Sequence, residues 1–135
     1  MRASINFFHR RISVSLFLLA ASCLVAVGCT GGQALPTYTV SVDGNAGQGR
    51  RVIESKGCGS CHTIPGIPNA KGVVGPPLMF FSRRTMIAGE LPNSPENLVR
   101  WLKNPPSVEP GTAMPDLGLT DKQANDVAAY LYTLR

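Results

Sequence analysis

The stretch "CGSCH", residues 58–62, places two cysteines and a histidine within five consecutive positions. Such a group can bind zinc, can cycle between dithiol and disulfide, or can attach a haem. These three kinds of site need different cellular compartments and different neighbouring residues. The rest of the chain therefore decides which one the motif forms.

The first 29 residues are expected to be a secretion signal and not part of the fold. Arg10 and Arg11 precede an almost wholly apolar run, Ile12 to Val27. A basic start, an apolar run and a small-residue end are the pattern of a signal peptide. About twenty apolar residues span a bilayer, so an uncleaved single-span anchor is the alternative.

Cys29 ends this segment in the sequence "AVGC" and resembles the cysteine of a bacterial lipobox. That resemblance implies lipidation of Cys29, which would become the N-terminus of the mature protein; Ser22-Cys23 is a weaker second candidate. An ordinary cleaved signal with incidental cysteines stays open. All these alternatives place Thr30 onward outside the cytoplasm, and we expect the periplasmic face of a bacterial inner membrane.

The charge of the mature part is modest. Three of the thirteen basic residues, Arg2, Arg10 and Arg11, lie in the signal, so residues 30–135 carry ten basic and eight acidic residues, a net charge of +2. No basic cluster is interleaved with aromatic residues, and nucleic-acid binding is therefore not expected.

Residues 30–44 are predicted to be a linker, and residues 45–135 one all-α domain. Three helices are predicted: Ala46 to Lys56, capped by Asn45; "PENLVRWLKN" after Ser94, ended by Pro105 and Pro106; and "DKQANDVAAYLYTLR" after Thr120. The loops between them are long and rich in Gly and Pro, and loops of this length usually have a function. Three short helices also make a small core, so a large apolar cofactor is expected to complete it.

In this setting haem fits the motif best. A structural zinc site takes four ligands, usually from two cysteine knuckles, whereas this sequence has one, and its other histidine, His9, lies in the signal. A thioredoxin-type dithiol belongs to a βαβ unit, which the pattern does not predict. C-x-x-C-H is the attachment sequence of c-type haem. Cys58 and Cys61 would form thioethers with the two vinyl groups, and His62 would bind the iron.

The second axial ligand is predicted to be a methionine. Met79, Met86 and Met114 are the candidates in the mature part. Met114 lies in a loop held by proline and glycine, which can present a side chain with little entropy to lose. Met79, in "LMFF", is interpreted as core, and Met86 as near a loop tip.

The stretches around the motif carry a family resemblance. They are "GRRVIESKGCGSCHT" at 49–63, "GPPL" at 75–78, "SRRT" at 82–85, "LKNPPSVEPGTAM" at 102–114 and "AAYLYTL" at 128–134. Together they resemble the class I monohaem cytochromes c, and especially the cytochrome c domains of bacterial haem–copper oxidases of the caa3 type. The resemblance covers most of the mature chain and implies the cytochrome c fold, with three main helices wrapped around one covalent haem.

The same resemblance implies roles for individual residues. His62 and Met114 would be the axial ligands, and the Pro76 carbonyl would accept a hydrogen bond from the His62 ring. Arg83 and Thr112 would lie near the haem propionates, with Arg84 in solvent. Gly49 and Tyr130 would lie where the first and last helices meet. Leu78 and Trp101 would pack on the haem.

One departure from the family concerns partner docking. Mitochondrial-type cytochromes carry several lysines in the methionine loop, where this chain has Pro106, Ser107 and Ala113. Long-range electrostatic steering is therefore not expected, and tethering would instead raise the effective concentration at the partner.

The sequence thus predicts a one-electron carrier, not an enzyme, that works between a respiratory donor complex and a terminal oxidase. We expect a monomer or a subunit of a larger complex. Two alternatives stay open: a haem sensor or catalyst with an open sixth site, and a fixed cytochrome subunit of a membrane oxidoreductase.

Overall fold

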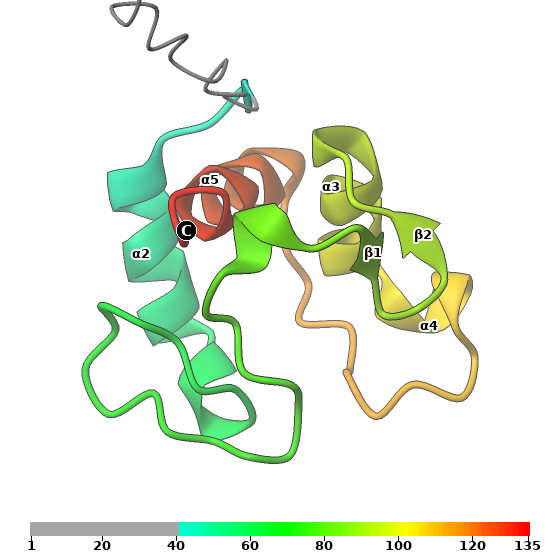
Figure 1. The fold of residues 1–135 in the computed structure, drawn as a ribbon, viewed down its shortest axis with the longest axis horizontal. Helices are drawn as coiled ribbons and strands as arrows, with labels where there is room; N and C mark the ends of the chain where they lie inside the picture. Colours follow the sequence, from blue (N-terminus) through cyan, green and yellow to red (C-terminus); the bar gives the residue numbers. More distant parts are fainter. Residues whose placement is uncertain (1–40) are drawn as a thin grey trace, which may run out of the picture. The chain divides into compact units, whose positions relative to one another are not determined.

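The computed structural model describes residues 41–135 of the chain (Figure 1). The expected signal segment 1–29, the proposed lipid site Cys29 and the linker up to residue 40 lie outside the described residues. Within residues 41–135, no helix is both long enough and apolar enough to cross a bilayer.

Helices dominate the described residues. They are α2 (Ala46–Ser55), α3 (Pro95–Lys103), α4 (Pro105–Val108) and α5 (Asp121–Leu131), with the 3-10 turns η1 (Cys58–Ser60) and η2 (Phe81–Arg83). Two short antiparallel strands, β1 (Met86–Ile87) and β2 (Leu91–Pro92), form a hairpin.

The predicted three helices fall at α2, α3 and α5, but the described residues hold a fourth. The helix before Pro105 ends as predicted, at Lys103, and Pro105 also begins α4, with Asn104 as the N-cap. Proline suits the first helical position because its missing N–H has no partner there. The hairpin was not predicted either, since two-residue strands leave no alternating pattern in the sequence.

Local side-chain caps start the three longer helices. Asn45 accepts a hydrogen bond from the Gln48 N–H at 2.9 Å, and Ser94 caps α3 just before Pro95. Thr120 and Gln123 form a capping box at α5, with both reciprocal hydrogen bonds present. Gly57, with φ of 69°, follows α2 and turns the chain into the "CGSCH" motif.

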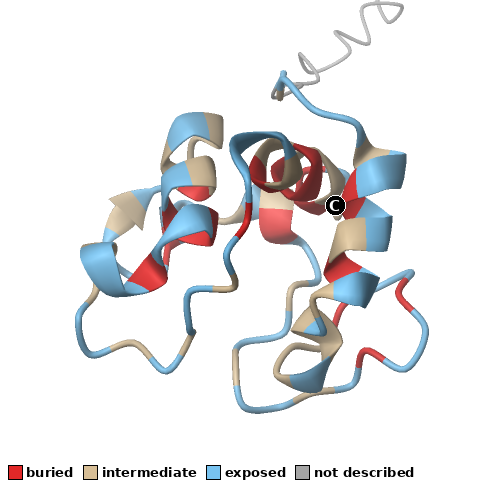
Figure 2. Ribbon diagram, turned by 180° about the vertical axis from the view of Figure 1, so that it is seen from behind, coloured by how far each residue is buried: buried red, intermediate tan, exposed pale blue. Residues whose placement is uncertain are grey.

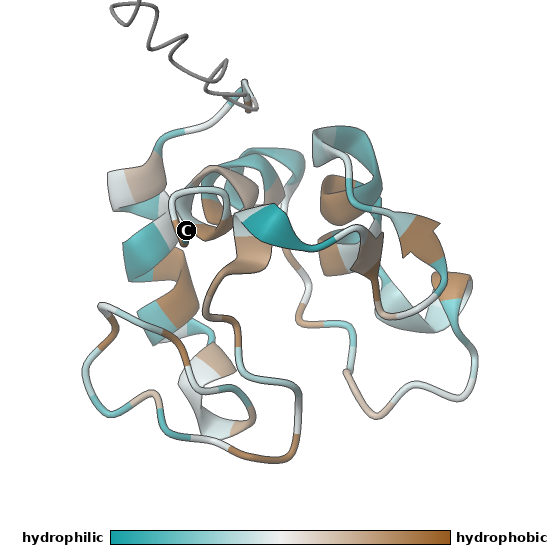
Figure 3. Cartoon of the chain, in the orientation of Figure 1, coloured by the Kyte–Doolittle hydropathy of each residue, from teal (hydrophilic) through white to brown (hydrophobic). Residues whose placement is uncertain are grey.

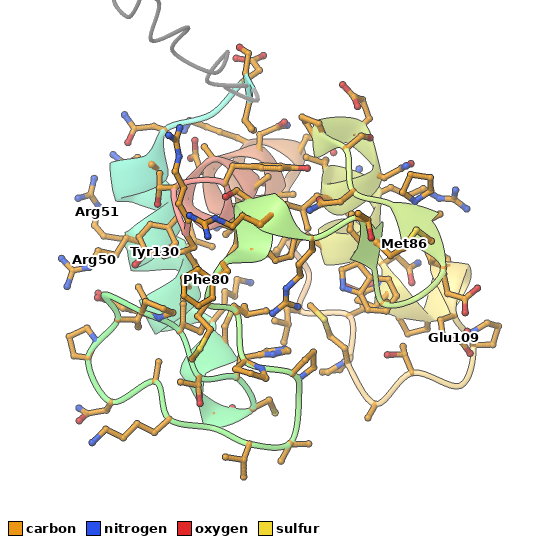
Figure 4. All side chains as sticks on the ribbon, in the orientation of Figure 1. Arg50, Arg51, Phe80, Met86, Glu109 and Tyr130 are labelled. Atoms are coloured by element: carbon orange, nitrogen blue, oxygen red, sulfur yellow. The ribbon has the colours of Figure 1, made fainter. Side chains whose placement is uncertain are left out.

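Helices α2 and α5 cross in backbone contact at Gly49 (Figure 1). A Cβ atom at Gly49 would lie 1.9 Å from the Asp126 carbonyl oxygen, so a larger residue would force the helices apart. Tyr130, also on α5, lies beside α2 in Figure 4, and its hydroxyl donates to the Pro65 carbonyl at 2.6 Å. The structure thus places Gly49 and Tyr130 where the resemblance implied.

The core gathers the apolar faces of these helices (Figures 2 and 3). Its members from α2, α3 and α5 are Ile53, Leu98, Trp101, Leu102, Ala124, Val127, Ala128 and Leu131. The polar faces of the same helices point to solvent; Arg50 and Arg51 project outward from α2 in Figure 4. This amphipathic pattern is what the i, i+3, i+4 spacing predicted.

A polar contact joins the segment around η2 to the end of the chain. The Tyr132 hydroxyl donates to Asn93 Oδ1 at 2.8 Å, and Asn93 Nδ2 donates to the Phe81 and Arg84 carbonyls at 3.1 and 3.0 Å. Tyr132 also meets the Phe81 ring edge-on, with centroids 5.8 Å apart. These contacts fix the backbone at Arg84, where the chain leaves η2.

A buried carboxylate holds the start of α2 against α5. Asp126 is 4% exposed; its Oδ1 accepts from the Asn45 N–H at 2.8 Å and its Oδ2 from Lys122 Nζ at 2.7 Å. The hydrogen bond from Lys122, and then that from Asn45, hold the pKa of Asp126 below its ordinary value.

We predict that Gly49→Ala destabilises the fold by about 1–3 kcal/mol, because the new methyl group overlaps the Asp126 backbone. Gly47→Ala is the control: it lies in the same helix, where a Cβ would meet only the Asn45 side chain, at 3.3 Å. Alanine there should be neutral or stabilise by up to about 1 kcal/mol. Thermal unfolding of both variants measures the difference, and equal melting temperatures would contradict the backbone contact.

We also predict an acid-dependent contribution from Asp126. Since its pKa is lower in the folded state, its stabilisation is complete above the unfolded pKa of about 4 and is lost as pH falls through the folded pKa. Asp126→Asn should lower stability at pH 7 by about 1–3 kcal/mol and flatten the decline of stability below pH 4. Urea unfolding between pH 2 and pH 7 measures both effects, with Glu90→Gln as the control for losing one carboxylate. An unchanged acid slope would refute this role.

Candidate functional site

A cavity of about 400 Å³ lies among the end of α2, the "CGSCH" motif, α3, α5 and the loop after α4. Protein interiors are close-packed, whereas this volume lies in the range of ligand pockets. Residues predicted from the sequence line it: Cys58, Cys61, His62, Pro76, Leu78, Trp101, Thr112 and Met114. Segments more than fifty residues apart in the chain thus meet at one site.

The single turn of η1 brings both cysteines to the cavity. The Cys61 and His62 N–H groups donate to the Cys58 carbonyl at 3.3 and 3.0 Å, and both cysteines are half-buried and free of any disulfide. Burial raises the pKa of the Cys58 thiol, which is the opposite of the activated thiolate found in dithiol redox motifs. Within residues 41–135, no group of three or more His, Cys, Asp or Glu side chains could hold a metal ion.

The His62 ring is held in one orientation. Its Nδ1 lies 2.7 Å from the Pro76 carbonyl oxygen. A carbonyl can only accept, so Nδ1 carries the hydrogen and Nε2 keeps its lone pair for a metal. The hydrogen bond that the resemblance implied is therefore present in the structure.

Gly75 makes this orientation possible. A Cβ atom at Gly75 would lie 2.3 Å from His62 Cε1, so any larger residue would collide with the ring. The Gly75 N–H donates to the Cys61 carbonyl at 2.8 Å, and the Leu78 N–H to the Thr63 carbonyl at 2.8 Å. These two hydrogen bonds fold the "GPPL" segment back along the motif and bring the Pro76 carbonyl to the histidine.

Met114 reaches the cavity from the loop that precedes α5. Its N–H donates to Thr112 Oγ1 at 3.2 Å, and the Thr112 N–H donates to the Glu109 carbonyl at 3.0 Å. The Thr112 hydroxyl accepts this bond and keeps its own hydrogen free to donate at the cavity wall. Met114 is half-buried, as a ligand directed inward should be.

The other methionines are placed differently. Met86, at the start of β1, also lines the cavity but is 42% exposed (Figure 4). Met79 was predicted to be core, and this was wrong: it is 40% exposed and does not line the cavity. Phe81, two positions further on, takes the buried place instead, at 4% exposure.

The structure corrects the choice between the two adjacent arginines. Arg83 is exposed and lies over the Phe80 ring, 5.5 Å from its centroid, away from the cavity. Arg84 is half-buried, lines the cavity and donates to the Pro77 carbonyl. Arg84 is the C-cap of the η2 turn and has extended backbone, with ψ of 145°. Two neighbouring arginines look alike in sequence, so this outcome needed the structure.

The remaining wall is mainly apolar. Trp101 on α3 is 8% exposed, and Leu78 is half-buried. The charged residues on the wall are Lys56, Arg84 and Glu109. Lys56 was interpreted only as the end of a helix; it lies two residues before Cys58, and that proximity was the signal available in the sequence.

The donor set of this cavity fits a c-type haem. It combines two free thiols spaced C-x-x-C, an imidazole whose Nε2 is available and a thioether on a separate loop, within mainly apolar walls. A porphyrin needs apolar walls, and its iron takes nitrogen and sulfur ligands. The residues present therefore match the group that the motif predicted.

Comparisons with known proteins agree with this arrangement. Residues 46–135 match the family model described as cytochrome c. Relatives named cytochrome c oxidase subunit 2 come from Alkalihalophilus pseudofirmus, with 39% identity over 103 residues, from Bacillus subtilis, with 35% over 96, and from Bacillus sp. strain PS3, with 36% over 87. These matches cover 74%, 67% and 62% of this chain and 27%, 26% and 24% of the relatives. The chain thus spans about a quarter of the length of these relatives.

Proposed function

Because this chain belongs to the cytochrome c family, we propose that it binds one covalent haem c and passes single electrons between respiratory partners. The observation that carries the proposal is the cavity of about 400 Å³. Its lining includes Cys58, Cys61, His62 and Met114. Haem bound there supplies an iron that alternates between Fe(III) and Fe(II).

The chain's own residues would hold the group in four ways. Cys58 and Cys61 would form thioethers with its vinyl groups, and His62 would bind the iron through Nε2, because Nδ1 is committed to Pro76. Met114 would bind the iron through its thioether sulfur, and a histidine–methionine pair raises the potential of haem iron. The guanidinium of Arg84, in place of Arg83, and the hydroxyl of Thr112 would meet the propionates.

The walls would also control access to the iron. Trp101, Leu98 and Ile64 are buried and line the cavity, so they would exclude water from the group. A bond from Met114 to the iron would leave no site free for small ligands, which favours electron transfer over ligand binding. An open-site sensor or catalyst would need another distal group, and His62 is the one histidine of residues 41–135.

We propose a terminal oxidase as the electron acceptor, with a respiratory complex as the donor. The support is that the matched relatives are named cytochrome c oxidase subunit 2. On this proposal the chain itself is a carrier and not the catalytic part of an enzyme. A fixed subunit of an oxidase complex would use the same site, and co-purification after gentle detergent extraction separates the two.

We further propose that residues 30–135 work on the extracytoplasmic face of a bacterial membrane, tethered through a lipid on Cys29. The support is the order of basic, apolar and small residues that ends in "AVGC". A lipid anchor of this kind adds about 0.8 kcal/mol for each buried methylene.

We predict that Met114→Ala lowers the reduction potential of the haem-loaded protein by on the order of 100 mV, because the methionine thioether stabilises Fe(II) relative to Fe(III). For one electron, a tenfold change in that relative stabilisation is about 59 mV. Met86→Ala is the matched control, since Met86 also lines the cavity but is more exposed. A potentiometric titration of the two variants and the wild type measures the effect. If Met114→Ala keeps the wild-type potential, Met114 does not bind the iron. A haem sensor or catalyst with an open site then becomes the favoured function.

We predict that Cys29→Ser releases the protein from the membrane fraction or leaves an unprocessed precursor. Cys23→Ser, which alters the weaker candidate site, should leave the wild-type distribution unchanged. Membrane fractionation with intact-mass measurement distinguishes these results. If Cys29→Ser shows both the wild-type distribution and the wild-type mass, apart from the substitution itself, lipidation at this residue is excluded.

A further inference from the structure

The Lys56 side chain joins two segments that are far apart in the sequence. Its Nζ lies 2.8 Å from the Leu117 carbonyl oxygen and 3.4 Å from that of Gly118, 61 and 62 positions away. Lys56 itself is half-buried, lines the cavity and stands two residues before Cys58. One ammonium group thus connects the attachment motif with the loop that carries Met114.

These contacts are not those of an ordinary lysine at the end of a helix. Lysine in the last turn commonly hydrogen-bonds the free carbonyls of its own helix. At the end of α2, the Lys56 backbone N–H already donates to carbonyls of that helix, Glu54 and Val52. The side chain instead reaches across to two consecutive carbonyls of another segment.

The loop that receives these hydrogen bonds has short-range support of its own. Gly111 N–H donates to Glu109 Oε1, Met114 N–H to Thr112 Oγ1, and Gly118 N–H to Asp116 Oδ1. Each of these bonds closes a turn over two residues, and none of them reaches the "CGSCH" motif. The Lys56 ammonium supplies such a link, three residues after Met114.

We propose that Lys56 is a positioning residue that holds the Met114 loop closed over the cavity and so strengthens the bond between Met114 and the haem iron. The inference rests on the proposed haem function and adds a residue that acts through Met114 and not on the iron. Without this link, the loop opens more often and the sixth position becomes available to added ligands.

The test is the binding of imidazole to the ferric haem-loaded protein, followed by its absorption spectrum. Imidazole must displace the Met114 thioether, so its affinity reports how firmly the loop is held. For Lys56→Met we expect an affinity about fivefold higher than for the wild type, which corresponds to about 1 kcal/mol. Lys56→Arg keeps a cationic donor and should stay within about twofold of the wild type.

Lys71→Met is the control for the loss of one positive charge, because Lys71 is exposed and does not line the cavity; its affinity should not change. Lys56→Gln, which is shorter, replaces the methionine variant if that protein does not accumulate. An imidazole affinity of Lys56→Met within twofold of the wild type would overturn the inference. So would an equal rise in Lys71→Met.

Failure of the proposed function gives a different result. In that case the wild type would bind imidazole as tightly as Met114→Ala, because Met114 would not hold the iron in either protein. The inference about Lys56 would then fall with it. If the wild type and Lys56→Met both bind imidazole weakly and equally, the inference about Lys56 is wrong and the proposed function stands.

Discussion

The backbone contact between α2 and α5 at Gly49 determines where both ends of the site lie. Helix α2 leads directly through Gly57 into the segment with Cys58, Cys61 and His62, and the loop with Met114 leads directly into α5. Crossing the two helices at van der Waals distance therefore fixes the starting points of the two segments that carry His62 and Met114. Asp126 reinforces the same crossing by binding the start of α2 from within α5.

Much of the site could be predicted because its signals are local in the sequence. "CGSCH" fixes three functional side chains within one turn, and the caps at Asn45, Ser94 and Thr120 mark the starts of helices that the structure shows. The Pro76 carbonyl came from family resemblance, Met114 from the proline and glycine of its loop and then from the resemblance, and the structure places both at the cavity. None of these predictions depended on knowing how distant segments pack.

The errors concern features that depend on such packing. Which of Arg83 and Arg84 faces the cavity is decided by the backbone after η2, which Asn93 and Tyr132 hold from elsewhere in the chain. Met79 sits in an apolar run, yet Phe81 takes the buried place. The sequence pattern identifies Lys56 only as the end of a helix, because the carbonyl groups that its side chain contacts lie some sixty positions away. Local pattern carries no information on contacts of that range.

The hydrogen bond from His62 to Pro76 has a consequence for which substitutions the orientation of the ring tolerates. The acceptor is a backbone carbonyl, which residue 76 has whatever its side chain, and the path of the "GPPL" segment places it 2.7 Å from Nδ1. A change of the side chain at residue 76 that keeps this backbone path therefore leaves the acceptor in place, whereas a change that bends the chain between Gly75 and Leu78 moves the acceptor away from the ring.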